Sequence, residues 1–457
     1  MKRTNIFRPK IELKSGRRRE KIYSSRFFSL CIFFLGLSSI SVAQTVLTLK
    51  DALQIGLENN FDIRIAKNDA EFSKTANTYG NAGFLPNVAA TGSRNFQWND
   101  INQKFASGLE VNRSGVATNT TNLGVAANWL FFDGGKMFIT KKKQDAQLTA
   151  AEIRIQSQII NFSDTLASAY YQLVLSKLDL EVSRQDENRT AERLKIASEQ
   201  FRIGTRPKSD QLIAKIDLNT IRNRIQNQMQ QIDIRKGAFN QLLGRDPEVV
   251  FEVVDSVTTV TRYDYSSLKA KVLGQNLQIK FQKQNLEVAK LGIKEIRSRG
   301  LPQLSLNTAY NFGRSRSQAG FALYNQSLGP NIGVSAIIPI FSGVSVNRLV
   351  KLANLDLETR NLQFKLAENR LLSQLWRALK TLDLYVESAD IEKQNIELAR
   401  ENNQIVEGRF RLGQATSLEL KDAEFQLSNA QSRLLQARFN AKIAENQVLR
   451  LSAELKL

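Results

Sequence analysis

Phe201-Arg202-Ile203-Gly204 returns 209 residues later (410 − 201) as Phe410-Arg411-Leu412-Gly413. The residues around these motifs return in the same order: Phe132 and Gly134 as Phe341 and Gly343 at this spacing, and Leu85-Pro86 as Leu301-Pro302 after 216 residues (302 − 86). This period lies well outside the roughly 20 to 50 residues of solenoid repeats. We therefore predict two tandem structural repeats, at residues 44–250 and 251–457, behind an N-terminal leader.

The first 43 residues have the pattern of a secretory signal peptide. Ten basic residues precede a short apolar run at 27–37, and Ser41-Val42-Ala43 forms a small-x-small cleavage site before Gln44. The apolar run has about half of the ~20 residues that a helix needs to span a membrane. We therefore expect cleavage after Ala43 and hold an uncleaved transmembrane anchor as the weaker alternative.

The composition argues against several classes of function. The leader carries ten basic and two acidic residues, so the net charge falls from +20 to +12 in the mature chain. The remaining charges are spread with mixed signs through predicted helices, which is typical of solvated faces, and we expect no nucleic-acid binding. The only cysteine is Cys31, in the leader, and the chain has no histidine. Thiolate and imidazole metal sites and the usual general base are then missing. This argues against hydrolase triads and zinc sites, and we expect no metal and no cofactor.

Two pairs of amphipathic strands are predicted, at about 87–132 and 303–341. Apolar and polar residues alternate along them, with apolar positions at Val88, Ala90, Phe96, Trp98, Leu123, Val125, Ala127 and Trp129, and at Leu304, Leu306, Tyr310, Phe312, Ile332, Val334, Ala336, Ile338 and Ile340. Runs of about eleven residues match tilted strands that cross an outer membrane. The polar stretch 99–121 is predicted to be an exposed loop. A half-buried sheet of a soluble sandwich is the alternative, but it would require more than four strands.

Long helices are predicted at 134–203 and 343–412. Apolar residues recur there at three- and four-residue steps, as in a coiled-coil seam, and about 70 residues give a length on the order of 100 Å. Each long helix turns at Gly204 or Gly413 and returns as a helix of about half that length, at 208–243 or 417–454. Single opening helices are predicted at about 47–83 and 268–299.

The helix lengths also predict a stacking arrangement. The return helix 208–243 and the next repeat's opening helix 268–299 together nearly match one long helix. The same holds for 417–454 and 47–83. We therefore expect each return helix to stack on the opening helix of the other repeat, with the non-helical segment 244–267 at the break.

The strand count predicts association between copies of the chain. Four strands in lipid leave open edges, whose unpaired backbone groups cost several kcal/mol each. A closed barrel needs at least about eight strands, and two copies would give a narrow interior filled with side chains. Three copies give twelve strands, so we predict a homotrimer: a mixed α+β membrane protein whose 12-stranded β-barrel continues into an α-helical barrel.

The chain resembles the TolC family of outer-membrane efflux channels over essentially all of 44–457. The matching segments are Leu-x-Leu-Lys-Asp-Ala-Leu at 47–53, Asn59-Asn60, Gly83-x-Leu85-Pro86, Phe131-Phe132-Asp133-Gly134-Gly135, Pro339-Ile340-Phe341-Ser342-Gly343 and both Phe-Arg-x-Gly motifs. Leu130 stands where the family has proline, and Ser342-Gly343-Val344 departs from its glycine pair. The resemblance implies a trimeric exit channel with its β-barrel in outer-membrane lipid and its α-barrel in the periplasm. Such a channel performs no chemistry, so we expect no enzyme.

The resemblance also implies partners and a docking site. A periplasmic adaptor and an inner-membrane transporter of RND, ABC or MFS type would dock at the far end, for drug efflux or protein secretion. The candidate docking residues lie in the two turns: Arg202, Gly204, Thr205, Arg411, Gly413 and Gln414. These residues are equally explained as helix caps, and both roles are compatible.

Two further groups of charged residues could have a function or could simply lie on solvated helix faces. Glu407 and Glu419 lie near the turns and would favour cations if they faced a lumen, although a solvated helix face is the stronger interpretation. Lys141-Lys142-Lys143 follows the first strand pair and suits either lipid headgroups or a solvated helix start.

Two other classes of protein also have long helical hairpins. A periplasmic coiled-coil adaptor should have one hairpin and compact β-rich modules. A soluble structural coiled-coil protein would leave the alternating strands unexplained. The exported substrate and the class of transporter are open at this point.

Overall fold

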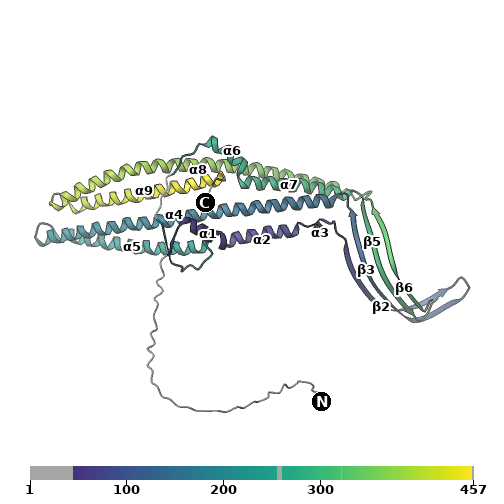
Figure 1. Ribbon diagram of the computed structural model, residues 1–457. Helices are drawn as coiled ribbons and strands as arrows, with labels where there is room; N and C mark the ends of the chain where they lie inside the picture. The colour runs from purple at the N-terminus through teal and green to yellow at the C-terminus, as the bar shows by residue number, and fades with distance from the viewer. Residues whose placement is uncertain (1–44, 255–259, 321, 455–457) are drawn as a thin grey trace, which may run out of the picture. The chain divides into compact units, whose positions relative to one another are not determined.

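The computed structural model describes residues 45–254, 260–320 and 322–454. The predicted signal peptide lies outside the described residues. Two long helical hairpins and a four-stranded sheet make up most of the described chain (Figure 1).

Each hairpin pairs a long helix with one of about half its length. The first joins α4 (Lys136–Arg202) to α5 (Lys208–Leu242), and the second joins α8 (Ser345–Arg411) to α9 (Ser417–Leu451). The long helices have 67 residues each and the return helices 35 each. The stripes expected from the sequence are buried between helices, including Leu166, Leu173 and Leu180 on α4 and Leu371, Leu375 and Leu382 on α8.

The opening segments are broken helices, so the prediction of single helices was wrong. The first contains α1 (Leu49–Asn59), α2 (Phe61–Ala76) and α3 (Tyr79–Ala82), and the second α6 (Tyr265–Gln275), α7 (Leu277–Arg297) and a short 3₁₀ turn, η1 (Ser298–Gly300). Asn60 and Asn276 take extended ψ values of 127° and 129° at the breaks. Their side chains cap the next helix by accepting from Ile63 N (3.2 Å) and Gln278 N (2.9 Å). An asparagine that bonds to backbone in this way competes with helix continuation.

The same two asparagines show that the predicted stacking was wrong. Asn60 Nδ2 donates to the carbonyl of Leu242 (3.2 Å), and Asn276 Nδ2 donates to that of Leu451 (2.9 Å). The return helix α5 therefore meets α1 and α2, and α9 meets α6 and α7, each within its own repeat (Figure 1). The last carbonyls of a helix need donors from elsewhere, and the side-chain amides supply them.

The described residues of the segment before Tyr265, 244–254 and 260–264, form no α-helix and contain a strand. β4 (Phe251–Val253) pairs in parallel with β1 (Thr45–Leu47), next to the breaks in the helices. The hydroxyl of Tyr170 on α4 fixes this small sheet, since it donates to Leu47 O (3.1 Å) and accepts from Val254 N (3.0 Å).

The larger sheet is antiparallel, in the order β2-β3-β5-β6. Its strands are β2 (Asn87–Lys104), β3 (Glu110–Phe132), β5 (Gln303–Ser317) and β6 (Tyr324–Ile337). The expected loop at 99–121 was wrong, because β2 and β3 continue through most of it and leave 105–109 as the turn. Side-chain polarity does not prevent backbone pairing. β6 ends before Pro339, which has no N–H to donate to a ladder.

Candidate functional site

The two turns at the ends of the hairpins have the same backbone geometry. Gly204 and Gly413 both have φ of +79°. Gly204 N donates to Phe201 O (3.0 Å) and Thr205 N to Gln200 O (2.9 Å); Gly413 N donates to Phe410 O (3.0 Å) and Gln414 N to Arg409 O (2.8 Å). This pair of bonds is the Schellman motif, which needs a left-handed residue and so favours glycine. The repeated motif therefore ends both long helices in the same way.

The predicted site residues lie in these turns and make local contacts. Arg202 pairs with Glu199 (2.8 Å) and Arg411 with Glu407 (2.6 Å). The Thr205 hydroxyl donates to Gln200 O (2.9 Å), and the Gln414 carbonyl accepts from Arg409 (3.2 Å). These contacts show that the residues cap the helix ends. They do not test docking, which involves a second protein.

The two acidic residues singled out near the turns are also locally engaged. Glu407 forms its ion pair with Arg411. Glu419 closes a capping box with Thr416 at the start of α9, and the backbone and hydroxyl of Thr416 lower the pKa of this carboxyl. These contacts are those of solvated helix ends.

Exposed aliphatic side chains at the turns were missed from the sequence. Ile203 is 61% exposed and Leu412 is 75% exposed, and Leu418 is exposed beside them at the start of α9. Burial would stabilise such side chains by about 1.5–3 kcal/mol each. The available signal was the third position of Phe-Arg-x-Gly, which is aliphatic in both copies.

The two turns contact each other and are not equivalent in burial. Gln200 Nε2 donates to the Phe410 carbonyl (3.3 Å), and the guanidinium of Arg206 lies 4.8 Å from the centre of the Phe410 ring. Arg206 also bonds to Asp210 (3.1 Å) and to the Ala415 carbonyl. Phe410 is fully buried, whereas its counterpart Phe201 is 39% exposed. The two hairpin ends therefore pack against each other, and the two copies of the motif differ in burial.

A buried ion network joins the hairpins behind the turns, and we name it the Arg193 clamp. Arg193 on α4 is 2% exposed and contacts Asp217 on α5 (2.9 Å) and Glu424 on α9 (3.4 Å). Lys421 on α9 completes the clamp through Asp217 (2.7 Å). Burial raises the pKa of Glu424 to about 6, because desolvation outweighs the attraction of Arg193 and Arg189.

The four-stranded sheet has one largely apolar face and one largely polar face, and the row Arg94-Thr121-Arg314-Gln326 is a polar exception on the apolar face. Residues paired across strands share a face. The apolar face contains the rows Ala90-Val125-Tyr310-Pro330, Gly92-Leu123-Phe312-Leu328 and Val88-Ala127-Thr308-Ile332, while the opposite face contains Thr91-Gly124-Asn311-Gly329, Ser93-Asn122-Gly313-Ser327 and Asn87-Asn128-Asn307-Gly333. Many large apolar side chains on the first face are exposed, among them Val88, Leu123, Val125, Leu328 and Ile332.

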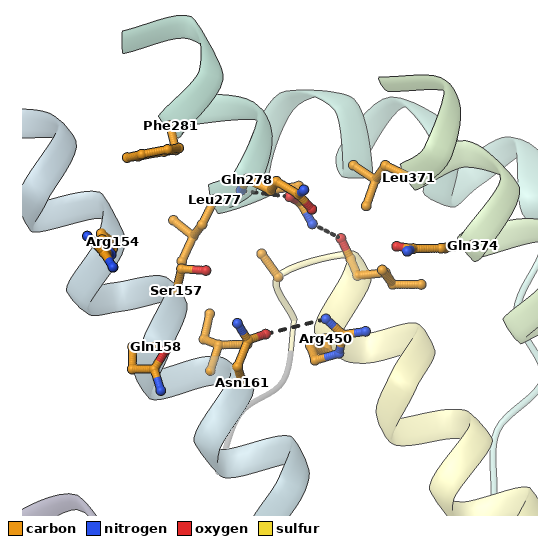
Figure 2. Close-up of a pocket in the computed structure, with 14 residues that line it drawn as sticks. Arg154, Ser157, Gln158, Asn161, Leu277, Gln278, Phe281, Leu371, Gln374 and Arg450 are labelled. Carbon is orange, nitrogen blue, oxygen red and sulfur yellow. Dashed lines mark hydrogen bonds between the residues drawn. The ribbon is translucent and has the colours of Figure 1, made fainter. Parts of the chain in front are cut away.

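A cavity of about 440 Å³ lies where the second broken helix meets the end of α9. Figure 2 shows Arg154, Asn161 and Gln158 approaching from α4, Gln278 and Phe281 from α7, and Arg450 from α9. Arg450 donates to Asn161 Oδ1 (3.4 Å) and pairs with Asp164 (3.0 Å), and burial raises the pKa of Asp164. The cavity is remote in sequence from the turns, and its charged groups are already partnered, so we place no function there.

The described residues contain neither a membrane-spanning helix nor a cluster of metal ligands. No helix in 45–254, 260–320 or 322–454 is both long and apolar enough to cross a membrane. Over the same residues, no group of three or more acidic side chains is placed to hold a metal ion.

Comparisons with known proteins agree with this architecture. The chain matches the model of the family described as "Outer membrane efflux protein" over residues 52–245 and 268–454. It is 22% identical to the outer membrane protein TolC of Escherichia coli (strain K12) over 346 residues, which cover 72% of this chain and 68% of TolC. It is 20% identical to the alkaline protease secretion protein AprF of Pseudomonas aeruginosa over 405 residues, 86% of this chain and 82% of AprF.

A solved channel structure has the same fold. The outer membrane channel CmeC of Campylobacter jejuni superposes with a TM-score of 0.76 at 16% identity, over 90% of this chain and 87% of CmeC. The family model covers both hairpins and all four strands of the larger sheet, and the named relatives are an outer membrane protein, a protease secretion protein and an outer membrane channel. The chain therefore belongs to the outer membrane efflux protein family, the family of TolC.

Proposed function

We propose that three copies of this chain form the outer-membrane channel of a tripartite efflux or type I secretion system. The sheets would form a 12-stranded barrel in the outer membrane, and the helices a continuous barrel in the periplasm. The channel would act as a passive duct, with energy supplied by an inner-membrane transporter. It would serve drug efflux, as the name of the antibiotic efflux pump outer membrane protein ArpC of Pseudomonas putida suggests, or protein export, as the name of AprF suggests.

The observation that carries this proposal is the four-stranded sheet itself. Its apolar face suits lipid and its polar face suits a water-filled lumen. Within the described residues, β2 and β6 are each paired on one side only. Open edges in lipid leave backbone groups without partners, and pairing β2 of one copy with β6 of the next would satisfy both edges.

The helices carry a second argument for association. Leu384, Ile391, Leu398 and Ile405 recur at every seventh position of α8, and all four are exposed. One aliphatic residue per heptad is half of the a/d pattern of a coiled-coil seam, and its exposure leaves an apolar stripe along α8. A helix of a neighbouring copy would cover it.

The turns are the proposed docking site for the adaptor. Arg202, Gly204, Thr205, Arg411, Gly413 and Gln414 shape the two helix ends, and Ile203, Leu412 and Leu418 add exposed aliphatic surface. Apolar anchors surrounded by charged side chains are the usual composition of a binding interface.

Disulfide crosslinking between copies tests the assembly. The mature chain has no cysteine if the leader containing Cys31 is removed, so engineered pairs have no background. Pairs with one cysteine on β2 and one on β6 are scanned for the register that crosslinks in isolated outer membranes. We expect covalent trimers on denaturing gels, and none when either cysteine is present alone. Recovery of the mature chain from the soluble periplasm without detergent would contradict the proposal.

A further inference from the structure

Six exposed basic residues lie where the helices meet the sheet, and we name them the basic collar. They are Lys142 on α4, Lys294 and Arg297 on α7, Arg299 in the following 3₁₀ turn, and Arg348 and Lys351 on α8. β3 ends four residues before α4 begins, and β5 begins six residues after α7 ends. At about 1.5 Å per helical residue, the collar lies within roughly 10 Å of the helix ends next to the strands. Figure 1 shows these ends of α4 and α7 meeting the sheet.

The acidic residues nearby do not neutralise the collar. Residues 133–148, 286–302 and 338–354 contain ten basic and four acidic residues, a net charge of +6. Glu295 pairs with Lys143 (2.7 Å) and Asp145 with Lys141 (2.5 Å). Within the described part of the chain, no collar residue forms an ion pair or hydrogen bond through its side chain. The positive charge is therefore free to meet an external anion.

Exposed aromatic and aliphatic side chains accompany these charges. Tyr79, Phe138, Ile340 and Phe341 are all exposed at the same junction. Phe84 stacks edge-on between Tyr79 (5.3 Å) and Phe138 (5.0 Å), and Lys141 lies 5.6 Å from the Tyr79 ring. Cations mixed with exposed aromatic rings are typical of a membrane–water interface, where ring and alkyl stem enter the apolar region and the charge stays among headgroups. A solvated helix face would not explain the aromatic residues.

We propose that the basic collar binds anionic phospholipid headgroups of the leaflet nearest the helices. This inference rests on the proposed insertion of the sheet in a membrane. The helix ends that carry the collar follow or precede the strands by only a few residues, so insertion of the sheet would bring these cations near the phosphate level. An anionic surface attracts each nearby Lys or Arg by about fivefold in binding constant, and the effect fades over about one Debye length, ~10 Å. The collar lies within this range of the helix ends that adjoin the strands.

Reconstitution of the full-length mature protein tests the proposal. The protein is placed in nanodiscs of phosphatidylcholine alone, or of phosphatidylcholine with about 30 mol% phosphatidylglycerol. The enrichment of a fluorescent phosphatidylglycerol around the protein is then measured. The collar variant carries Arg297→Gln, Arg299→Gln, Arg348→Gln and Lys351→Gln. The matched control neutralises four exposed cations of the helices that also lack ion pairs: Lys215→Gln, Arg224→Gln, Lys269→Gln and Lys365→Gln.

We expect the wild-type protein and the control to enrich the anionic lipid, and the collar variant to lose at least about tenfold of that preference. High salt should reduce the wild-type preference as well. Equal preference in the collar variant and the wild type, or an equal loss in the control, would overturn the lipid site. Insertion of the wild type without lipid preference would overturn the collar alone, whereas failure to insert in either bilayer would overturn the proposed channel too.

Discussion

The guanidinium of Arg193 on α4 lies 3.4 Å from the carboxylate of Glu424 on α9. The two residues belong to different hairpins, and Arg193 is almost completely buried. Arg193 also contacts Asp217 of its own hairpin at 2.9 Å, so one buried cation links three helices. Because an unpaired buried charge is costly, separation of the hairpin ends at this level would require the clamp to be solvated or protonated.

Glu424→Gln should flatten the pH dependence of stability. The pKa of Glu424 is raised from 4.5 to about 6 in the folded chain, so the folded state binds the proton more tightly than the unfolded state. The contribution of this carboxyl to the free energy of unfolding is fully present below about pH 4.5 and is lost as the pH rises through 6. A shift of this size corresponds to about 2 kcal/mol.

Thermal unfolding at pH 5.0 and pH 7.5 measures this effect in detergent. The charges around Glu424 are Arg193, Arg189, Asp186, Glu407, Asp217 and Lys421, so the readout is the difference between variant and wild type at the two pH values. Glu192→Gln, at an exposed position on α4, serves as the control. An unchanged pH difference in Glu424→Gln would show that this carboxyl does not titrate in the range.

Arg193→Ala should weaken the attachment of the hairpins to each other. The change leaves Asp217 with Lys421 and Glu424 with Arg189 as the remaining cations, and loss of one partner from a buried pair costs about 3–5 kcal/mol. Denaturant unfolding of the wild type and variant measures the loss. Lys195→Ala, which removes an exposed cation from α4, should change stability by less than about 0.5 kcal/mol. Similar stability in Arg193→Ala would contradict the clamp.

Asn60→Ala and Asn276→Ala should each destabilise the fold by about 1–3 kcal/mol. Each change removes an N-cap and the donor to a return-helix carbonyl. Asn354→Ala is the control, because its exposed amide bonds only to its own helix at Val350 O (2.9 Å). Hydrogen exchange at the ends of α5 and α9 reports the loss locally. Protection that is unchanged in both variants would argue against the role of these asparagines in joining the helices.

Gly204→Ala and Gly413→Ala should destabilise each turn by about 1 kcal/mol. A Cβ would meet no atom within 4 Å at either position, so the cost comes from the left-handed φ of +79° alone. Gly292→Ala is a suitable comparison, since it lies within α7 in open space and should stabilise by up to about 1 kcal/mol. Thermal midpoints of the three variants should therefore move in opposite directions.

Ile203→Asp combined with Leu412→Asp should reduce export while leaving outer-membrane assembly intact. Each change replaces an exposed aliphatic side chain by a carboxylate. The hydrogen bonds of the turns are made by backbone atoms, so we expect the turns to keep their conformation. Export of a known substrate and crosslinking to the adaptor are measured together. Val46→Asp, at an exposed aliphatic residue of β1, is the matched control. Normal export by the double variant would remove the exposed aliphatic residues from the docking site.

The sequence predicted elements whose cause is local. The three- and four-residue spacing of apolar positions produced α4 and α8 close to their predicted ends, and the glycine of Phe-Arg-x-Gly ends each helix through its own φ angle. Period-two alternation predicted all four strands. The predicted end of β2 was too early, because the polar residues after Asn99 favour a loop by composition and yet pair with β3. Asn60 and Asn276 break the opening helices, but one asparagine is too weak a local signal to distinguish a break from a continuous helix.

The remaining features depend on contacts between distant residues. Asn60 meets Leu242 and Asn276 meets Leu451, so each return helix joins its own repeat, opposite to the arrangement that helix lengths alone suggested. The Arg193 clamp and the burial of Phe410 but not Phe201 depend on how the two hairpins face each other. The sequence by itself determined helix lengths, turn type and strand alternation, because these follow from neighbouring residues. Only the tertiary structure decided stacking and which charges are buried, because helix rotation and long-range pairing depend on the whole packed arrangement.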